Sequence, residues 1–240
     1  MAERLLFLAG GTEGNVLDLV AEEFVPAAGG RDSTIALLMM GGQGWESYLP
    51  RYVEPWEKRG ASRHSVIVPG DDGVVDLDNA LRRLREATGI FVAGGHTPTY
   101  HRLYAAEPIR SVIRQRYRDG VPVAGLSAGA LLAPEICVLH PSRNAADEPV
   151  TIVQGLGLVS NLVVAVHFTE RNTLPILLDA MSRTQTRCAL GIGASACAVF
   201  ENERLARVLG GCVYEITMTD SESRRHTIAQ VGGPPLEEGP

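Results

Sequence analysis

Short runs of apolar residues alternate with amphipathic stretches along most of this chain. The first four runs are Leu5–Ala9, Thr34–Met40, Ser65–Val68 and Ile90–Ala93. Runs this short are typical of strands buried on both faces, and such strands form parallel sheets that helices cover. The pattern therefore predicts an α/β fold with a mostly parallel sheet and helices on both of its faces.

The stretches between these runs have helical periodicity. They predict helices at Asn15–Glu23, Trp45–Arg59, Asp78–Ala87 and Tyr100–Asp119. The middle of the chain adds strands at Val121–Ala124, Leu162–Val166 and Ala189–Ile192, and a helix at Thr173–Ser182.

The last part of the chain changes character. A polar turn at Glu201-Asn-Glu203 between Ala196–Phe200 and Leu205–Leu209 predicts a C-terminal β-hairpin, and Val213–Met218 predicts a further strand. No repeat or linker divides the chain, whose 240 residues suffice for one sizeable domain. We therefore expect a single α/β domain over residues 1–231, followed by a flexible Pro/Gly-rich tail at 232–240.

The charge of the chain argues against some classes of partner. Lys and Arg number 22 against 28 Asp and Glu, giving a net charge of −6, and the longest basic run is the pair Arg224-Arg225. A nucleic acid or a membrane is therefore not expected as a partner. No apolar run reaches the length of a membrane span, and Leu5–Ala9 is too short for a signal peptide. These features predict a cytoplasmic protein.

The four cysteines, Cys137, Cys188, Cys197 and Cys212, are scattered along the chain. None belongs to a C-x-x-C pair, and no histidine lies at the spacing of a zinc ligand. The pattern predicts buried free thiols and no metal site.

Glycine-rich loops follow three of the predicted strands, at Gly10–Gly14, Gly41–Gly44 and Gly94-Gly-His-Thr97. Ligands of open α/β sheets bind at the carboxyl ends of strands, where such loops meet. The first loop lacks the spacing of a dinucleotide-binding loop, and no acidic residue ends the second strand. We therefore expect a ligand site at this edge and no cofactor.

A candidate nucleophile follows the predicted strand Val121–Ala124. The strand leads into Gly125-Leu-Ser-Ala-Gly129 and then into a helix that begins with small residues. A Gly-x-Ser-x-Gly segment between a strand and a helix is typical of a nucleophile elbow, a sharp turn that exposes the serine hydroxyl. The N–H groups at the start of the helix suit a developing oxyanion. The alternative is a tight turn whose serine only caps the helix.

A serine nucleophile requires a base, and the base requires an orienting carboxylate. His167 directly follows the apolar strand Leu162–Val166, which places it at the same sheet edge as Ser127 if the strands are parallel. His140, in a loop near the elbow helix, is the alternative base.

Three carboxylates are candidates for the acid. Asp147 and Glu148 lie in a polar loop between the elbow helix and the histidine strand, and they are the first and second choices. Glu170, three residues after the histidine, is the third.

These segments resemble the S51 serine peptidase family, which includes dipeptidase E and cyanophycinase. The resemblance covers residues 5–218 and is carried by Gly10-Gly11, Phe91–Thr97, Gly125–Ala130, Gly155–Asn161 and His167–Arg171. It implies a fold akin to class I glutamine amidotransferase domains, with a serine in place of their cysteine.

The resemblance also implies roles for individual residues. It carries the nucleophile onto Ser127 and the base onto His167, and it aligns the Asp-x-Pro pattern of the dipeptidase E branch onto Asp147-Glu-Pro149. The backbone N–H groups of Gly95 and Ala128 would then form the oxyanion hole.

Substrate binding is expected to involve His96, Thr97 and Arg171. The pair His96-Thr97 replaces the Asn-Thr or Asp that usually follows the family's two glycines, and the Arg171 guanidinium suits a substrate carboxylate. The alternative for Arg171 is a structural role, in an ion pair with Glu170 or Asp179.

This chain differs in two ways from the cyanophycinase members of the family, which cleave a polymer of aspartate and arginine. The segment Gly191–Cys197 lacks the carboxylate that these members show there, and the polar and arginine residues around their histidine are mostly absent. Cleavage of cyanophycin is therefore not expected.

The sequence thus predicts a serine peptidase that hydrolyses short peptides or isopeptides through a Ser-His-Asp/Glu triad and an acyl-enzyme. The alternatives are an esterase of the α/β-hydrolase type, an amidase acting on a small substrate, and a weak or inactive family member that acts as a binding protein. The edge strands of the C-terminal hairpin are candidates for pairing in a homodimer.

Overall fold

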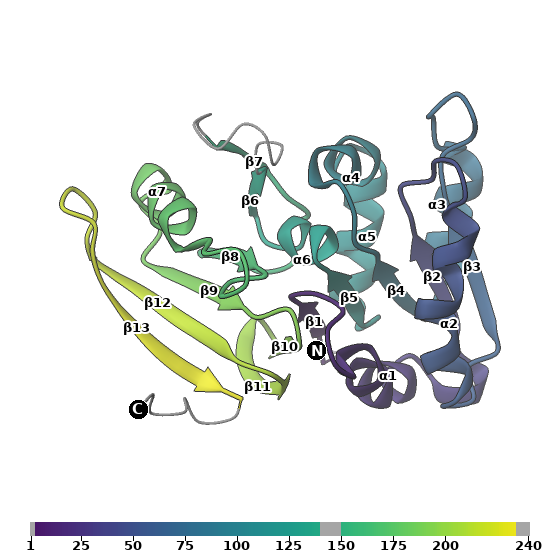
Figure 1. Cartoon of the computed structure of the whole chain (residues 1–240). Helices are drawn as coiled ribbons and strands as arrows, with labels where there is room; N and C mark the ends of the chain where they lie inside the picture. The colour runs from purple at the N-terminus through teal and green to yellow at the C-terminus, as the bar shows by residue number, and fades with distance from the viewer. Residues whose placement is uncertain (1–2, 140–149, 234–240) are drawn as a thin grey trace.

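The computed structural model describes residues 3–139 and 150–233, and its centre is a seven-stranded sheet (Figure 1). The strand order is β11-β10-β1-β5-β4-β2-β3, and β1, β5, β4, β2 and β3 run parallel. The strands are β1 (Leu5–Ala9), β2 (Thr34–Leu38), β3 (Arg63–Ile67), β4 (Gly89–Val92), β5 (Val123–Leu126), β10 (Ala196–Glu201) and β11 (Arg204–Gly210). The predicted mostly parallel sheet is confirmed.

The helices pack on this sheet and on one another, with α1 beside α2 and α3 beside α5. The first five are α1 (Val16–Ala27), α2 (Leu49–Glu57), α3 (Leu77–Glu86), α4 (Thr97–Tyr104) and α5 (Ile109–Arg118). Helix α6 (Ala128–Leu132) follows β5, and α7 (Leu174–Thr184) precedes β9. Short 3-10 turns occupy Gly30–Asp32 and Trp45–Tyr48. No helix in the described ranges has the length and apolar character that crossing a bilayer requires.

A second sheet of four strands lies beside β10, on the left in Figure 1. Its order is β13-β12-β9-β8, with β8 (Leu162–Val166) parallel to β9 (Cys188–Ile192), and β12 (Val213–Asp220) and β13 (Arg225–Gly232) antiparallel. A separate pair, β6 (Ile136–Leu139) and β7 (Thr151–Gln154), is antiparallel. The strand that ends before His167 therefore belongs to a different sheet from the strand under Ser127.

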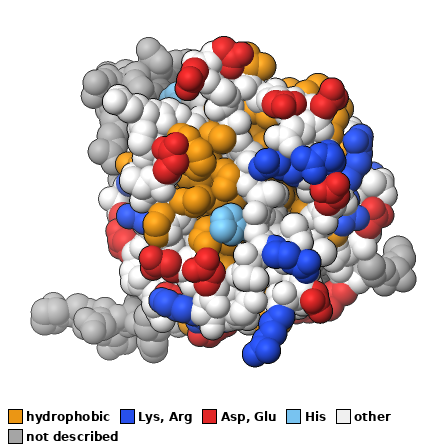
Figure 2. Space-filling view, turned by 90° about the vertical axis from the view of Figure 1, so that its right-hand side faces the viewer, with side chains coloured by type: hydrophobic (Ala, Val, Ile, Leu, Met, Phe, Trp, Pro, Cys, Tyr) orange, Lys and Arg blue, Asp and Glu red, His pale blue; other side chains and the backbone are white. Residues whose placement is uncertain are grey.

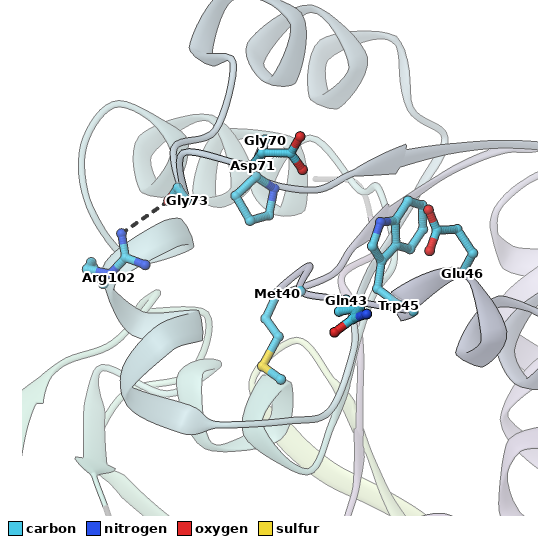
Figure 3. Close-up of a pocket in the computed structure, with 11 residues that line it drawn as sticks. Met40, Gln43, Trp45, Glu46, Gly70, Asp71, Gly73 and Arg102 are labelled. Carbon is cyan, nitrogen blue, oxygen red and sulfur yellow. Dashed lines mark hydrogen bonds between the residues drawn. The ribbon is translucent and has the colours of Figure 1, made fainter.

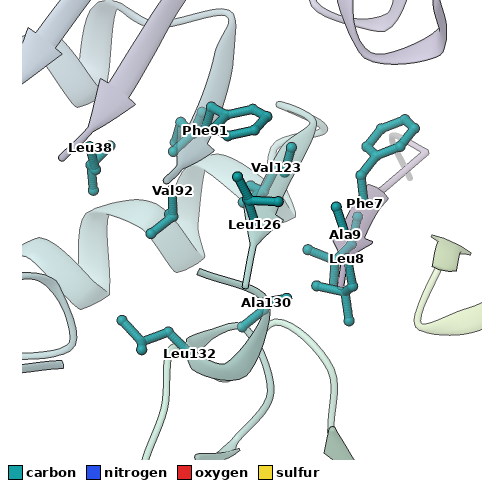
Figure 4. Packing of buried hydrophobic residues seen from close by; sticks show 14 of the residues in the cluster. Phe7, Leu8, Ala9, Leu38, Phe91, Val92, Val123, Leu126, Ala130 and Leu132 are labelled. Carbon is teal, nitrogen blue, oxygen red and sulfur yellow. The ribbon is translucent and has the colours of Figure 1, made fainter. Parts of the chain in front are cut away.

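The core is built on the central strands, whose successive residues are almost all buried because helices cover both faces of the sheet (Figure 4). Because successive strand residues point to opposite faces, Phe7 and Phe91 meet Phe24 of α1, with ring centroids 5.9 and 6.1 Å apart. Trp56 of α2 joins this cluster at 5.4 Å from Phe91. These aromatic side chains hold α1 and α2 against the sheet.

Three details of the predicted secondary structure were wrong. The helix predicted over Tyr100–Asp119 is two helices, α4 and α5, because Pro108 lacks an N–H group and disfavours helical geometry in the residue before it. Strands β6, β7 and β13 were not predicted: β7 and β13 lack a continuous apolar run, and the run Ile136–Leu139 of β6 was overlooked. The predicted tail begins too early, since Gly232 belongs to β13, and residues 234–240 lie outside the described ranges.

The edge strand β3 closes the sheet on the side shown in Figure 2, where charged side chains surround hydrophobic ones. The Arg83 guanidinium from α3 donates to the carbonyl oxygen of Val66 in this strand, at 2.5 Å. A charged cover of this kind discourages an edge strand from pairing with another chain. This edge is therefore a poor candidate for association.

None of the four cysteines, all of which the structure describes, forms a disulfide bond, as predicted. Cys137 and Cys197 are buried, and burial raises the pKa of Cys137 to about 12. Cys188 is exposed and Cys212 is half-buried, which corrects the expectation that every thiol is buried.

Candidate active site

The Gly-x-Ser-x-Gly segment forms a sharp turn between β5 and α6. Ser127 has a φ of 50° and a ψ of −104°, an unfavourable conformation for a residue with a side chain, and its N–H group donates to the carbonyl oxygen of Ala9 at 2.8 Å. A β-carbon on Gly125 would lie 2.5 Å from the Gly129 backbone, and one on Gly129 would lie 2.1 Å from the oxygen of Val92. Both glycines are therefore required for the close approach of backbones that forms the turn.

The predicted base lies opposite the serine. Ser127 Oγ and His167 Nε2 are 3.1 Å apart, within hydrogen-bond distance, although the two residues are forty positions apart in the sequence. His167 follows β8 in a left-handed conformation with a φ of 49°, and both side chains are half-buried. The structure thus brings together a hydroxyl and an imidazole in the arrangement that serine nucleophiles use.

The loop that carries His167 is anchored to the second sheet. The N–H group of Phe168 donates to the carbonyl oxygen of Ile192 at 3.1 Å, and the Phe168 ring lies 5.4 Å from the Tyr214 ring between centroids. The ring packs directly over Gly191, where a β-carbon would lie only 2.4 Å from it. The Gly191-Ile-Gly193 segment thus has a structural role that the sequence did not reveal, which is to admit Phe168 and hold the histidine in place.

Replacing Gly191 with alanine tests this anchor. The new methyl group would force the Phe168 ring aside, and overpacking of this kind costs about 1–3 kcal/mol. Because a misplacement of about 1 Å can lower a rate by about 10²-fold, we expect kcat/KM to fall by roughly that factor in a protein that still folds.

The matched control is Gly30→Ala, since a β-carbon at Gly30 would meet nothing within 4 Å, although its φ of +61° also disfavours alanine. It should lower the melting temperature and leave kcat/KM unchanged. A folded Gly191→Ala protein with wild-type kcat/KM would show that the anchor does not position the histidine.

The candidate acids have different outcomes. Asp147 and Glu148 lie outside the described residues, as does the alternative base, His140. Glu170 has a structural partner, because its Oε1 atom accepts the N–H group of Ala194 at 3.0 Å and so joins the loops after β8 and β9. The choice between Asp147 and Glu148 therefore stays a prediction.

Gly95 and Ala128, the expected oxyanion donors, follow Gly94 and Ser127 directly in the sequence. Ala128 is the first residue of α6, where backbone N–H groups have no partner within a helix. A β-carbon on Gly94 would lie 3.3 Å from the Ser127 β-carbon, and the Tyr100 hydroxyl donates to the Gly94 carbonyl oxygen at 3.2 Å. Within the described residues neither the Gly95 nor the Ala128 amide donates a hydrogen bond, so both are available to a ligand.

The expected substrate-binding residues lie in the segments that follow β4 and β8. His96 precedes α4, where its Nδ1 atom lies 2.9 Å from the Thr99 hydroxyl, and Thr97 is the first residue of that helix. Arg171 is exposed on the turn after the histidine, and its N–H group donates to the His167 carbonyl oxygen at 3.0 Å.

The structural alternative proposed for Arg171 finds no support among the described residues. The Asp179 carboxylate pairs with Arg183 and Arg224 instead, at 3.4 and 2.7 Å, and no ion pair joins Arg171 to Glu170. The exposed Arg171 side chain thus forms no ion pair within the described ranges.

Two cavities lie beside the Gly94-Gly95 loop. The outer one, of about 540 Å³, is polar: Glu46, Asp71 and Arg102 line it, and Arg102 donates to the Gly73 carbonyl oxygen at 3.4 Å (Figure 3). The inner one, of about 390 Å³, reaches Gly94 and Gly95 themselves. The glycine-rich loops after β2 and β4 thus meet beside a ligand-sized space, as expected from the sequence, although the side chains that line it could not be predicted.

The first glycine-rich loop has a structural explanation. A β-carbon on Gly10 would lie 2.3 Å from the Gly193 oxygen, and one on Gly11 would lie 2.8 Å from the Ala194 side chain. The two glycines thus let the loop after β1 contact the loop between β9 and β10. Over the part of the chain that the structure describes, no three His, Cys, Asp or Glu side chains are grouped to hold a metal ion.

Comparison with solved structures places the fold. The crystal structure of a peptidase from an acI-B1 Actinobacterium superposes with a TM-score of 0.64, at 17% identity, and covers 90% of this chain and 95% of its own. A putative peptidase E protein from Listeria monocytogenes EGD-e superposes with a TM-score of 0.60, at 18% identity, covering 85% of this chain and 98% of its own. At these identities the similarity concerns the fold.

Comparison of sequences identifies the family. Cyanophycinase from Synechococcus elongatus is 28% identical over 210 residues, which are 86% of this chain and 65% of that protein. Cyanophycinase from Geminocystis herdmanii is 28% identical over 211 residues, or 87% of this chain and 77% of that protein. This chain thus spans only 65% of the length of the Synechococcus relative. The profile of peptidase family S51 matches residues 5–208, and the chain therefore belongs to that family.

Proposed function

We propose that this protein is a serine peptidase that hydrolyses short peptides through an acyl-enzyme. The observation that carries the proposal is the 3.1 Å separation of Ser127 Oγ and His167 Nε2 at a strained strand-to-helix turn. Strain at a residue whose hydroxyl faces an imidazole is a feature of nucleophile elbows. Membership of the S51 family agrees with this chemistry.

The mechanism begins with proton transfer from the Ser127 hydroxyl to His167, while the serine oxygen attacks the peptide carbonyl carbon. The imidazolium then donates this proton to the leaving amine as the C–N bond breaks, and an ester on Ser127 forms. Water, deprotonated by the same imidazole, then attacks the ester carbonyl. The bond between the acyl carbon and the Ser127 oxygen breaks, the imidazolium returns its proton to that oxygen, and the acid is released. A carboxylate from Asp147 or Glu148 would hold the imidazole in the required tautomer.

The oxyanion of each tetrahedral intermediate would be bound by the N–H groups of Gly95 and Ala128. Each donor of this kind contributes about 3 kcal/mol to stabilisation of the transition state in serine proteases. Both amides are without a hydrogen-bond acceptor within the described residues, which supports this role.

The experiment that tests the proposal combines hydrolysis and labelling. A panel of di- and tripeptides, amides, simple esters and the β-aspartyl-arginine isopeptide would be incubated with the wild-type protein. The isopeptide is included because the sequence relatives are cyanophycinases. A fluorophosphonate would be used in parallel, with mass spectrometry to locate the label. Peptide turnover with label on Ser127, and none on the exposed Ser160, is expected.

Other outcomes would favour the alternatives. Turnover of esters alone would indicate an esterase, and turnover of small amides alone would indicate an amidase. A serine that is unlabelled in a folded protein without turnover would indicate a binding protein.

Arg171 is proposed to bind the carboxylate of the substrate. Its exposed guanidinium lies on the turn that carries His167 and has no ion pair among the described residues. Since hydrogen bonds to charged groups contribute about 1.5–3 kcal/mol, Arg171→Ala should raise KM roughly tenfold for peptides with a free carboxylate. Amidated peptides should be unaffected.

The control is Arg187→Ala, another exposed arginine, which lies at the far end of the neighbouring strand β9. It should change KM for neither class of peptide. An equal rise in KM for free and amidated peptides would exclude recognition of a carboxylate by Arg171.

A further inference from the structure

The inner cavity beside the Gly94-Gly95 loop is lined mainly by apolar and aromatic side chains. Its volume is about 390 Å³, which is within the range of pockets that bind small ligands. The side chains that line it are Met39, Met40, Gln43, Trp45, Tyr48, Tyr52 and Tyr100, and the rest of the wall is glycine. Among the described residues, no Asp, Glu, Lys or Arg lines it, whereas Glu46, Asp71 and Arg102 line the neighbouring outer cavity.

The cavity is directly adjacent to the candidate nucleophile. Gly94 lines it and also lies close to Ser127, because a β-carbon on Gly94 would be 3.3 Å from the Ser127 β-carbon. On its other side Gly95 contacts the wall, because a β-carbon there would lie 2.9 Å from Met40 Sδ and 3.0 Å from the Tyr100 ring. A peptide carbonyl bound at Ser127 would therefore place a neighbouring side chain at the mouth of this cavity.

The wall of the cavity is uncharged and held in place. Tyr52 and Tyr100 are buried, and burial raises the pKa of each phenol, so both stay neutral at physiological pH. The Tyr100 hydroxyl donates to the Gly94 carbonyl oxygen, and Met40 Sδ accepts the His96 N–H group at 3.5 Å. A charged side chain entering this cavity would lose its hydration without gaining an ionic partner.

The position of the cavity relative to His167 indicates which part of a peptide it would receive. In the large sheet β4 and β2, whose loops form the cavity, lie on one side of β5. The sheet that carries His167 lies on the other side, beyond β1 and β10 (Figure 1). Because the imidazole donates its proton to the leaving amine, the leaving group lies next to His167 and the acyl part points toward the cavity.

We propose that this cavity is the specificity pocket for the acyl residue, and that it selects a large apolar or aromatic side chain. The inference rests on the proposed peptidase function and adds the class of substrate. Burying a side chain such as that of Phe or Leu favours binding by roughly ten- to a hundredfold over leaving it exposed. We therefore expect peptides with Phe or Leu as the acyl residue to have a kcat/KM at least tenfold above those with Asp.

The variant Tyr48→Arg tests the pocket without disturbing the core. The Tyr48 side chain is 56% exposed at the rim, so its replacement should not unfold the protein. Loss of an aromatic contact, together with a positive charge at the rim, should lower the kcat/KM ratio of Phe over Asp substrates by roughly fivefold or more. Ile228→Arg, at an exposed site on β13, is the matched control and should leave the ratio unchanged.

Binding to the Ser127→Ala protein separates this inference from the proposed function. Calorimetric titration with N-acetyl-phenylalaninamide and N-acetyl-aspartamide requires no catalysis. The phenylalanine compound should bind at least tenfold more tightly, and Tyr48→Arg in the same background should reduce that preference. Equal affinities, a preference for aspartate, or a preference that Tyr48→Arg leaves unchanged would overturn the pocket assignment. Failure of the wild-type protein to hydrolyse any peptide would instead overturn the proposed function.

Discussion

Ser127→Ala should lower kcat for peptide hydrolysis by on the order of 10⁶-fold, the loss seen when the serine or histidine of a serine-protease triad is removed. The variant should keep the backbone of the turn, because the N–H group of residue 127 can still donate to the Ala9 carbonyl oxygen. Alanine is no less able than serine to adopt a φ of 50°. Stability should therefore stay close to that of the wild type, and the loss should lie in the chemical step alone.

A double mutant strengthens this test. If Ser127 and His167 act as a unit, His167→Ala should cost nearly as much as Ser127→Ala, and the two changes together should cost no more than either. Active-site titration and single-turnover kinetics would measure these losses, and thermal unfolding would confirm that each variant is folded. Strictly additive losses, or a Ser127→Ala protein that keeps its activity, would exclude the proposed acyl-enzyme.

The second large effect concerns the acid of the triad. Asp147→Asn should lower kcat by about 10⁴-fold, because an amide favours the wrong imidazole tautomer and does not stabilise the imidazolium. Glu148→Gln, the adjacent change of the same kind, should leave kcat close to that of the wild type. Each variant is thus the control for the other, and KM should change little in either.

The reverse pattern would assign the acid to Glu148. A small effect from both changes would contradict a triad that takes its carboxylate from this loop. In that case Glu170→Gln would be the next variant, although its carboxylate already accepts the Ala194 N–H group. Steady-state kinetics on one peptide substrate is sufficient for all three variants.

Local sequence was a good guide wherever the structure depends on local interactions. The predicted boundaries of β1 and β8 agree with the structure residue for residue, since each strand is a continuous apolar run next to a polar or glycine-rich segment. The strand-to-helix turn at Ser127 was recognisable because its two glycines allow backbone contacts that no other residue permits.

Long-range packing determined what the sequence did not reveal. Strand β13 mixes polar and apolar residues, most of them exposed, so only its pairing with β12 makes it a strand. The contact of Phe168 with Gly191 likewise joins two segments whose patterns give no sign of each other. The apolar cavity is formed by loops after β2 and β4 that are neighbours only because those strands pair.

By itself the sequence determined the α/β fold, the turn that exposes Ser127 and the family to which the chain belongs, because each depends on local periodicity, on glycines or on contiguous motifs. Only the tertiary structure decided that His167 reaches Ser127 from a second sheet, and that an uncharged pocket lies on the opposite side of the serine. The physical reason is that such contacts depend on how strands pair and sheets pack, and the free energy of that packing is shared among residues far apart in the chain.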